Sequence, residues 1–120
     1  MRAAAIAALA LAGCAAGQLA APGTAEARLG EIARLGDLAV RPLAVIEDSR
    51  CPRDVTCVWA GRLRLGAAVG GVPAELVLGE PFALPGGGTI TLVAATPEPW
   101  QNPPPGVEGR PASRFAFRRD

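Results

Sequence analysis

The sequence contains no histidine, no tyrosine and no lysine among its 120 residues. Histidine is the usual general base and the commonest nitrogen ligand of metal ions. Serine–histidine catalysis, cysteine–histidine catalysis and the usual zinc sites are therefore excluded. We expect a protein that is not an enzyme and that holds no metal or other cofactor.

The charges are nearly balanced. There are 12 arginines against 11 acidic residues. Removing Arg2 with an N-terminal leader leaves 11 of each, so the remaining chain has a net charge near zero. A nucleic-acid-binding protein normally carries a basic excess gathered on one face. We therefore expect no nucleic-acid partner.

The N-terminus has the pattern of an export signal. Met1-Arg2 is a short positive start, and residues 3–12 form an apolar run of Ala, Ile and Leu. This run is too short for a membrane span, which needs roughly 20 residues. Leu11-Ala12-Gly13-Cys14 then resembles the bacterial lipoprotein signal, which is cut just before the cysteine that becomes lipidated. An ordinary secretory leader with a chance cysteine is the alternative.

Lipidation of Cys14 would attach the protein to a membrane through its N-terminal acyl chains. The sequence thus predicts a signal peptide over 1–13, a lipidated cysteine and flexible tether over 14–27, and one domain over 28–120. A coil of that length reaches about 20 Å on average. Ala15, in place of an aspartate, favours the outer membrane over the inner membrane, on its periplasmic or surface face.

The domain has the pattern of an all-β protein. Short apolar segments alternate with turn signals every 8 to 12 residues or so, which predicts a small antiparallel β-sandwich of about seven strands, immunoglobulin-like in general architecture. The expected strands are 38–46, 57–69, 74–78, 89–94 and a last one carrying Phe115 and Phe117, with two short strands within 26–35 preferred to a helix because glycines interrupt that segment. Gly86-Gly87-Gly88 predicts a hairpin turn.

Two cysteines remain once Cys14 is lipidated. An exported chain meets an oxidising compartment, so we expect Cys51 and Cys57 to form a disulfide. The resulting ring is interpreted as a scaffold device, with a rigid recognition loop as the alternative. Redox catalysis is disfavoured because the five-residue spacer lacks the CxxC arrangement. Trp59 is expected on the strand that follows, packed beside the disulfide.

The cysteine block also resembles a known family. The residues Asp48-Ser49-Arg50-Cys51-Pro52, four further residues and Cys57-Val58-Trp59-Ala60-Gly61 are similar to the signature of a family of uncharacterised bacterial envelope lipoproteins. Weaker similarity extends over most of residues 29–118. The resemblance implies a small β-rich domain and brings no established activity.

The segment 96–106 is rich in proline and carries Trp100. Such a composition favours extended, polyproline-like geometry. Two interpretations of Trp100 stay open: a lid over one end of the core, or an exposed aromatic anchor for a partner.

The leading functional hypothesis is a non-enzymatic envelope lipoprotein that binds an envelope protein or supports an envelope assembly. The candidate partner-binding residues are Asp48, Arg50, Arg53, Asp54, Trp59 and Trp100, with Arg50 or Arg53 able to pair with Asp48 or Asp54. An inhibitor of a protease or wall hydrolase, acting through the disulfide-closed loop, is the alternative. A hydrolase using only carboxylates would need Glu75, Glu80, Glu98 and Asp48 to converge in a cleft.

Overall fold

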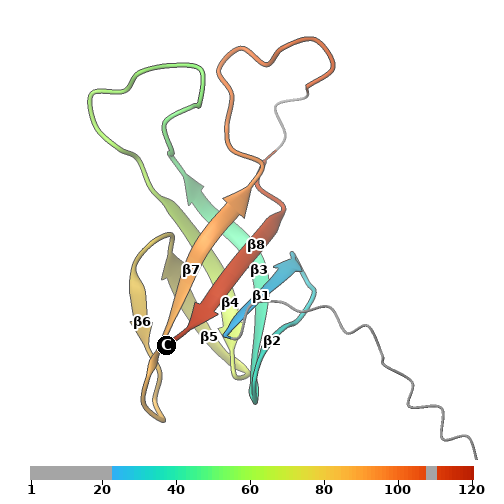
Figure 1. Cartoon of the computed structure of the whole chain (residues 1–120), viewed down its shortest axis with the longest axis vertical. Coiled ribbons are helices and arrows are strands. Elements are labelled where there is room, and N and C mark those ends of the chain that lie inside the picture. Colours follow the sequence, from blue (N-terminus) through green and yellow to red (C-terminus); the bar gives the residue numbers. More distant parts are fainter. Residues whose placement is uncertain (1–22, 108–110) are drawn as a thin grey trace, which may run out of the picture.

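A computed structural model describes residues 23–107 and 111–120 of the chain. This part is all-β, with two antiparallel sheets of four strands each, which confirms the predicted sandwich (Figure 1). Within the same residues there is no helix that could cross a membrane. The strands, eight where about seven were expected, are β1 (Thr24–Arg28), β2 (Ala33–Leu35), β3 (Leu38–Asp48), β4 (Leu63–Val69), β5 (Val72–Val77), β6 (Pro81–Ala83), β7 (Thr89–Thr96) and β8 (Arg114–Arg119).

The two sheets are joined by two crossings of the chain. One sheet has the order β1-β8-β7-β6 and the other has the order β2-β3-β4-β5. The chain passes from the first sheet to the second between β1 and β2, and returns between β5 and β6. Every neighbouring pair within a sheet is antiparallel.

The core is filled by alternate residues of the strands. In β4 the burial alternates strictly, because successive side chains of a strand point to opposite faces. Phe115 and Phe117 of β8 are fully buried, as their spacing predicts, and lie between outward arginines. The buried apolar residues are Ala27, Ala33, Leu35, Val40, Leu63, Leu65, Ala67, Val69, Leu76, Ile90, Leu92, Ala95, Ala112, Phe115 and Phe117.

The first strand corrects the predicted domain boundary. β1 begins at Thr24, inside the segment 14–27 expected to be a tether. In its register with β8, Ala25 pairs with Phe117 and Ala27 with Phe115. The small alanines thus lie opposite the two largest core side chains, so a segment of low hydrophobicity still contributes a strand. The signal peptide and Cys14 lie outside the described residues.

Proline marks irregular positions in the sheets. Pro42 in β3 is followed by a register shift against β4, and a second shift lies between Val45 and Glu47. A register shift suits this position, since proline cannot donate to a strand ladder. β6 begins with Pro81 and has three residues, which is too short for an alternating pattern, and it was not predicted.

The two ends of the sandwich differ (Figure 1). At the lower end the connections are tight: Gly70 and Gly71, both with positive φ, form the two-residue turn between β4 and β5. The chain also enters the sandwich there, because the Arg119 amide donates to the Gly23 carbonyl at 2.7 Å. At the upper end two long loops emerge, residues 49–62 and residues 97–113.

Candidate functional site

Residues 49–62 form the cysteine loop, which connects β3 to β4. Three hydrogen bonds between Ser49 and Arg62 close its base: the Ser49 amide and the Ser49 hydroxyl donate to the Arg62 carbonyl at 2.8 and 3.1 Å, and the Arg62 amide donates to the Ser49 hydroxyl at 3.1 Å. Gly61 fits there because a Cβ on it would overlap the Ser49 carbonyl. Glycine is therefore required at position 61 for the two sides of the loop to meet.

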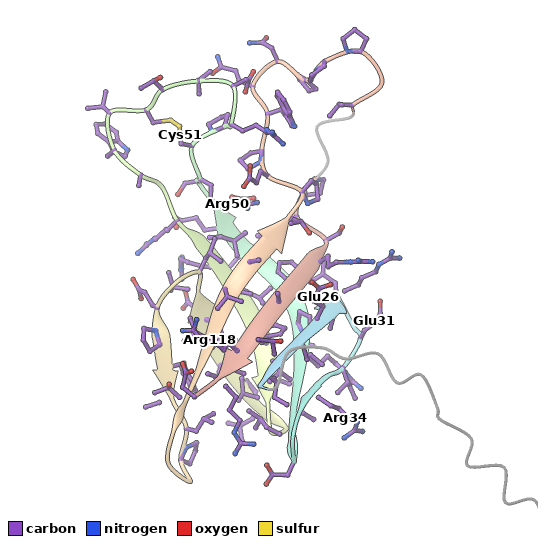
Figure 2. The ribbon with its side chains drawn as sticks, viewed as in Figure 1. Glu26, Glu31, Arg34, Arg50, Cys51 and Arg118 are labelled. Atoms are coloured by element: carbon purple, nitrogen blue, oxygen red, sulfur yellow. A yellow bond between two sulfur atoms is a disulfide. The ribbon has the colours of Figure 1, made fainter. Side chains whose placement is uncertain are left out.

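The disulfide between Cys51 and Cys57 is present, which confirms the predicted pairing. The Cα atoms of the two cysteines are 5.9 Å apart, and the Val55 amide donates to the Pro52 carbonyl at 3.2 Å within the ring. In Figure 2 the yellow sulfur bond lies at the upper end, beside the label of Cys51. The ring thus turns the chain sharply at this position.

The same ring explains why the expected strand over 57–69 begins only at Leu63. β3 ends at Asp48, and the following residues curl into the ring. Residues 57–62 therefore have no extended neighbour with which to form a ladder. Strand alternation inferred from the sequence does not account for this loss of a pairing partner.

Arg50 joins the cysteine loop to β7. Its guanidinium binds both carboxylate oxygens of Asp48, at 2.8 and 2.9 Å, and donates to the carbonyl oxygens of Ala95 at 2.7 Å and Pro97 at 3.2 Å. Its side chain is 12% exposed. The hydrogen bond from Arg50 is the main reason that the pKa of Asp48 lies below its usual value. Charge-assisted, bidentate bonds of this kind fix orientation as well as adding stability.

Of the two carbonyls that Arg50 binds, that of Ala95 belongs to an incompletely paired part of the sheet, and that of Pro97 follows the end of β7. β6 pairs only with residues 89–91 of β7, so the upper half of β7 has a single neighbouring strand, β8. Exposed strand edges invite unwanted pairing. Arg50 therefore occupies a sheet edge with side-chain donors, and Figure 2 shows it between the cysteine loop and the strands.

Residues 97–113 form the proline loop, of which 97–107 and 111–113 are described. Asp54 of the cysteine loop accepts hydrogen bonds from the Gln101 and Asn102 amides, each at 2.8 Å, through its two carboxylate oxygens. These bonds, the one from Gln101 first, lower the pKa of Asp54. Asp54 thus caps the proline loop as a side chain caps a turn.

Arg53 makes two further contacts with the proline loop. Its amide donates to the Pro99 carbonyl at 3.0 Å, and its guanidinium lies 4.6 Å from the ring centroid of Trp100, in cation–π geometry. Trp100 is half-buried and lies outside the core cluster. The Trp100 ring therefore contacts the cysteine loop and does not cover the core as a lid.

The second half of the cysteine loop projects into solvent. Val58 is 93% exposed and Trp59 is 79% exposed. The prediction that Trp59 packs beside the disulfide on a strand face is therefore wrong. Within the part of the chain that the structure describes, no hydrogen bond, ion pair or ring contact involves Thr56, Val58, Trp59 or Ala60. We call Val58 and Trp59 the apolar tip.

A pocket of about 310 Å³ lies between the two loops and β7. Arg50, Cys51 and Arg53 line it from the cysteine loop, and Glu98 and Pro99 line it from the proline loop. Leu78 and the upper part of β7 supply the rest of its wall. The pocket is small, is lined by side chains of both charges, and lies where the cysteine loop and the proline loop meet.

The six candidate residues thus lie together at the upper end, with different roles. Asp48, Arg50, Arg53 and Asp54 bind groups within the molecule, and Trp100 is stacked under Arg53. Trp59 is the one whose side chain is free for a partner. The sequence reasoning missed Val58, which the cysteine spacing does not distinguish from a strand residue.

The same reasoning missed the hydrogen bonds between the loops because backbone groups take part in each of them. The carbonyls of Ala95, Pro97 and Pro99 and the amides of Gln101 and Asn102 are available on almost any residue. No residue type at these positions signals the contact. In the described segments, no three cysteine, aspartate or glutamate side chains gather closely enough to hold a metal ion.

The chain matches no family model, no curated protein and no solved structure at a significant level. The similarity of the cysteine block to envelope lipoproteins therefore stays a prediction.

Proposed function

We propose that this protein is a non-enzymatic bacterial envelope lipoprotein that binds another protein through the cysteine loop. The observation that carries the proposal is the apolar tip, Val58-Trp59, exposed on a loop whose base is fixed to the rest of the domain. The lipoprotein signal at Leu11–Cys14 and the position of Ala15 support attachment to the outer membrane, on its periplasmic or surface face.

The chemistry of the tip favours a protein partner. Residues 55–61 carry no charge, and Val58 and Trp59 are both exposed, so the tip could enter a concave apolar site on another molecule. Burying an exposed tryptophan or valine side chain is worth roughly 1.5–3 kcal/mol. Tryptophan is also among the residues that most often dominate binding energy in protein interfaces.

The orientation of the domain supports the same proposal. Gly23 and Thr24 pair with Arg119 and Arg118 at the lower end, whereas the cysteine loop leaves the sandwich at the upper end (Figure 1). A membrane anchor at Cys14 would therefore be attached to the end opposite the tip. The tip would face away from the anchoring membrane and toward a partner beyond it.

Site-specific photo-crosslinking in the cells that make the protein tests this proposal. A photoreactive amino acid replaces Val58 in the full chain, and the matched control replaces Val72, which is 61% exposed and lies beside the turn at the lower end. We expect one discrete, protease-sensitive adduct from position 58 and none from position 72. Arg53 is a poor probe position because its replacement would remove the contact with Trp100.

A second variant makes the adduct informative about the tip. Trp59→Ser in the crosslinking background is expected to abolish the adduct while the domain stays folded. An adduct that survives Trp59→Ser, equal labelling from both positions, or no adduct from position 58 would each count against binding through the apolar tip.

Inhibition of a hydrolase is the second candidate. It is favoured by the projection of a disulfide-closed loop beyond the body of the sandwich, a shape that could enter an active-site cleft. Inhibition of a periplasmic or extracellular protease or wall hydrolase by the purified chain, lost when the disulfide is opened, would support it over an assembly role.

The carboxylate-only hydrolase has less support from the geometry. Asp48 is bound by Arg50, and Glu75 is paired with Arg64 on β4. Their pKa values are lowered mainly by these hydrogen bonds, whereas a general acid needs a raised pKa. Of the four glutamate and aspartate candidates, only Glu98 lines the pocket beside the cysteine loop.

A further inference from the structure

The cysteine loop has two arms that are held in different ways. Residues 50–54, the fixed arm, bind Asp48, β7 and the proline loop through Arg50, Arg53 and Asp54. Residues 56–60, the free arm, carry the apolar tip, and within the described parts of the chain only the disulfide at Cys57 holds them between Val55 and Gly61. Apart from the backbone at Val55, the disulfide is thus the single link between the tip and the fixed arm.

The two sulfur-bearing residues are also unequal in access. Cys57 is exposed, whereas Cys51 is half-buried and lines the pocket together with Arg50 and Arg53. Thiol–disulfide exchange requires a thiolate to approach one sulfur, and the rate depends on which sulfur is accessible. Glu98 lines the same pocket, so the side chains around Cys51 carry charges of both signs. Accessibility of the sulfur atom therefore decides which cysteine is attacked.

From these two asymmetries we infer that the Cys51–Cys57 disulfide is a thiol-exchange site, which an external thiol opens by attack on Cys57, and that opening releases the apolar tip while the fixed arm stays in place. The consequence for partner binding rests on the proposed function. The exchange itself does not, since it depends only on the loop.

The chemistry is a two-electron reduction. An external thiolate attacks the Cys57 sulfur, the Cys51–Cys57 bond breaks, and a mixed disulfide forms on Cys57. The electron pair leaves on the Cys51 sulfur, which takes up a proton from water. With a dithiol, the second thiolate attacks the reductant's own sulfur in the mixed disulfide and releases the Cys57 thiolate. The dithiol becomes the disulfide, and both cysteines are reduced.

A monothiol shows which sulfur is attacked. The full chain is exposed briefly to reduced glutathione, quenched with iodoacetamide and mapped by peptide mass spectrometry, with the denatured chain as the reference. We expect glutathione on Cys57 and the alkyl group on Cys51, at a ratio at least about tenfold above the denatured chain. A ratio equal to that of the denatured chain, or the reverse assignment, would overturn the inference.

A second measurement follows the release of the tip. The Trp100→Phe variant keeps an aromatic ring under Arg53 and leaves Trp59 as the single tryptophan. On reduction with dithiothreitol, the fluorescence anisotropy of Trp59 should fall, while amide exchange at Gln101 and Asn102 stays unchanged. The double variant Cys51→Ser, Cys57→Ser should behave as the reduced protein without any reductant.

Two results would contradict release of the tip alone. Unchanged Trp59 anisotropy on reduction would mean that the disulfide does not hold the free arm. Loss of protection at Gln101 and Asn102 together with Trp59 would mean that the whole loop surface depends on the disulfide. Both readouts are made without a partner, so they are separate from failure of the crosslinking experiment.

Discussion

The fixed arm and the free arm of the cysteine loop are separated by Val55 alone and are built in opposite ways. The fixed arm places a charged or hydrogen-bonding side chain on the rest of the domain at Arg50, Arg53 and Asp54. The free arm presents Val58 and Trp59 to solvent. A single loop thus divides its residues between those that hold it in place and those that are available to a partner.

This division explains how a small domain can carry an exposed apolar tip. Contacts of the fixed arm order both loops without using the tip, so the tip residues are not needed for stability. Preordering of the base lowers the entropy that binding would cost. The comparison therefore predicts large effects on stability from the fixed arm and small ones from the free arm.

The largest effect is expected from Arg50→Met. Methionine fills similar space but cannot donate a hydrogen bond, so the Asp48 carboxylate and the carbonyls of Ala95 and Pro97 lose their partner. The partly buried position suggests a loss of about 2–3 kcal/mol in the free energy of unfolding. Denaturant unfolding measures this, with Arg62→Met as the matched control. Arg62 pairs with Glu47 on the surface and is 61% exposed, so it should cost under about 1 kcal/mol. A control loss equal to that of Arg50→Met would contradict the role of Arg50.

Gly61→Ala should cost about 1–3 kcal/mol, because the new Cβ would push against the Ser49 carbonyl and open the base of the loop. Gly86→Ala is the control. Gly86 has open space around its Cβ position and no positive φ, so its replacement should be nearly neutral. Thermal unfolding of the two variants side by side decides the matter, and equal melting temperatures would refute the close contact at Gly61.

Acid should loosen the fixed arm before the core. The pKa values of Asp48 and Asp54 are lowered by hydrogen bonds to Arg50 and to the Gln101 and Asn102 amides. A carboxylate with a lowered pKa stabilises the fold above its unfolded value of about 3.9, and this contribution is lost as pH falls through the folded value. Amide exchange at Gln101 and Asn102 should therefore accelerate below about pH 4, relative to the intrinsic rate, while β4 stays protected.

The matched variant for this test is Asp54→Asn. It should show weakened protection at both amides at neutral pH and little further change in acid. Equal acid sensitivity in the variant and the wild-type chain would place the titrating group elsewhere.

The smallest effect on stability is expected from Trp59→Ser. Because the side chain is 79% exposed, and no hydrogen bond, ion pair or ring contact to it occurs among the described residues, the free energy of unfolding should change by no more than about 0.5 kcal/mol. Leu65→Ala, at a fully buried position of β4, should cost about 2–5 kcal/mol in the same denaturation experiment. A cost for Trp59→Ser approaching that of Leu65→Ala would mean that the tip belongs to the fold.

Local pattern predicted most of the sandwich and little of the loop surface. The alternation in β4 and β8 marks the core because each strand is half-buried and its period is two. The disulfide could be predicted from the cysteine count together with the oxidising compartment that the N-terminal pattern predicts. The prediction of a strand over Cys57–Arg62 was wrong, because a strand there would need residues 49–54 to run alongside it as a pairing partner. The disulfide ring prevents this.

Sequence pattern missed the strand in the predicted tether and the bonds between the two loops for related reasons. Ala25 and Ala27 were not recognised as strand residues because their burial depends on the phenylalanines opposite them in β8. The bonds between the two loops run from Arg50 and Asp54 to backbone groups, and no residue type identifies those groups in advance. Where a contact depends on a distant backbone position, sequence pattern carries no signal for it.

Residue-resolved amide exchange by NMR, on the oxidised chain at neutral pH, tests the division of the loop most directly. We predict protection at Arg53, Gln101 and Asn102, which are hydrogen-bonded in the structure, and exchange near the unfolded rate at Val58, Trp59 and Ala60. Equal protection across both arms, or fast exchange at Gln101 and Asn102, would contradict the division of the loop into one fixed arm and one free arm.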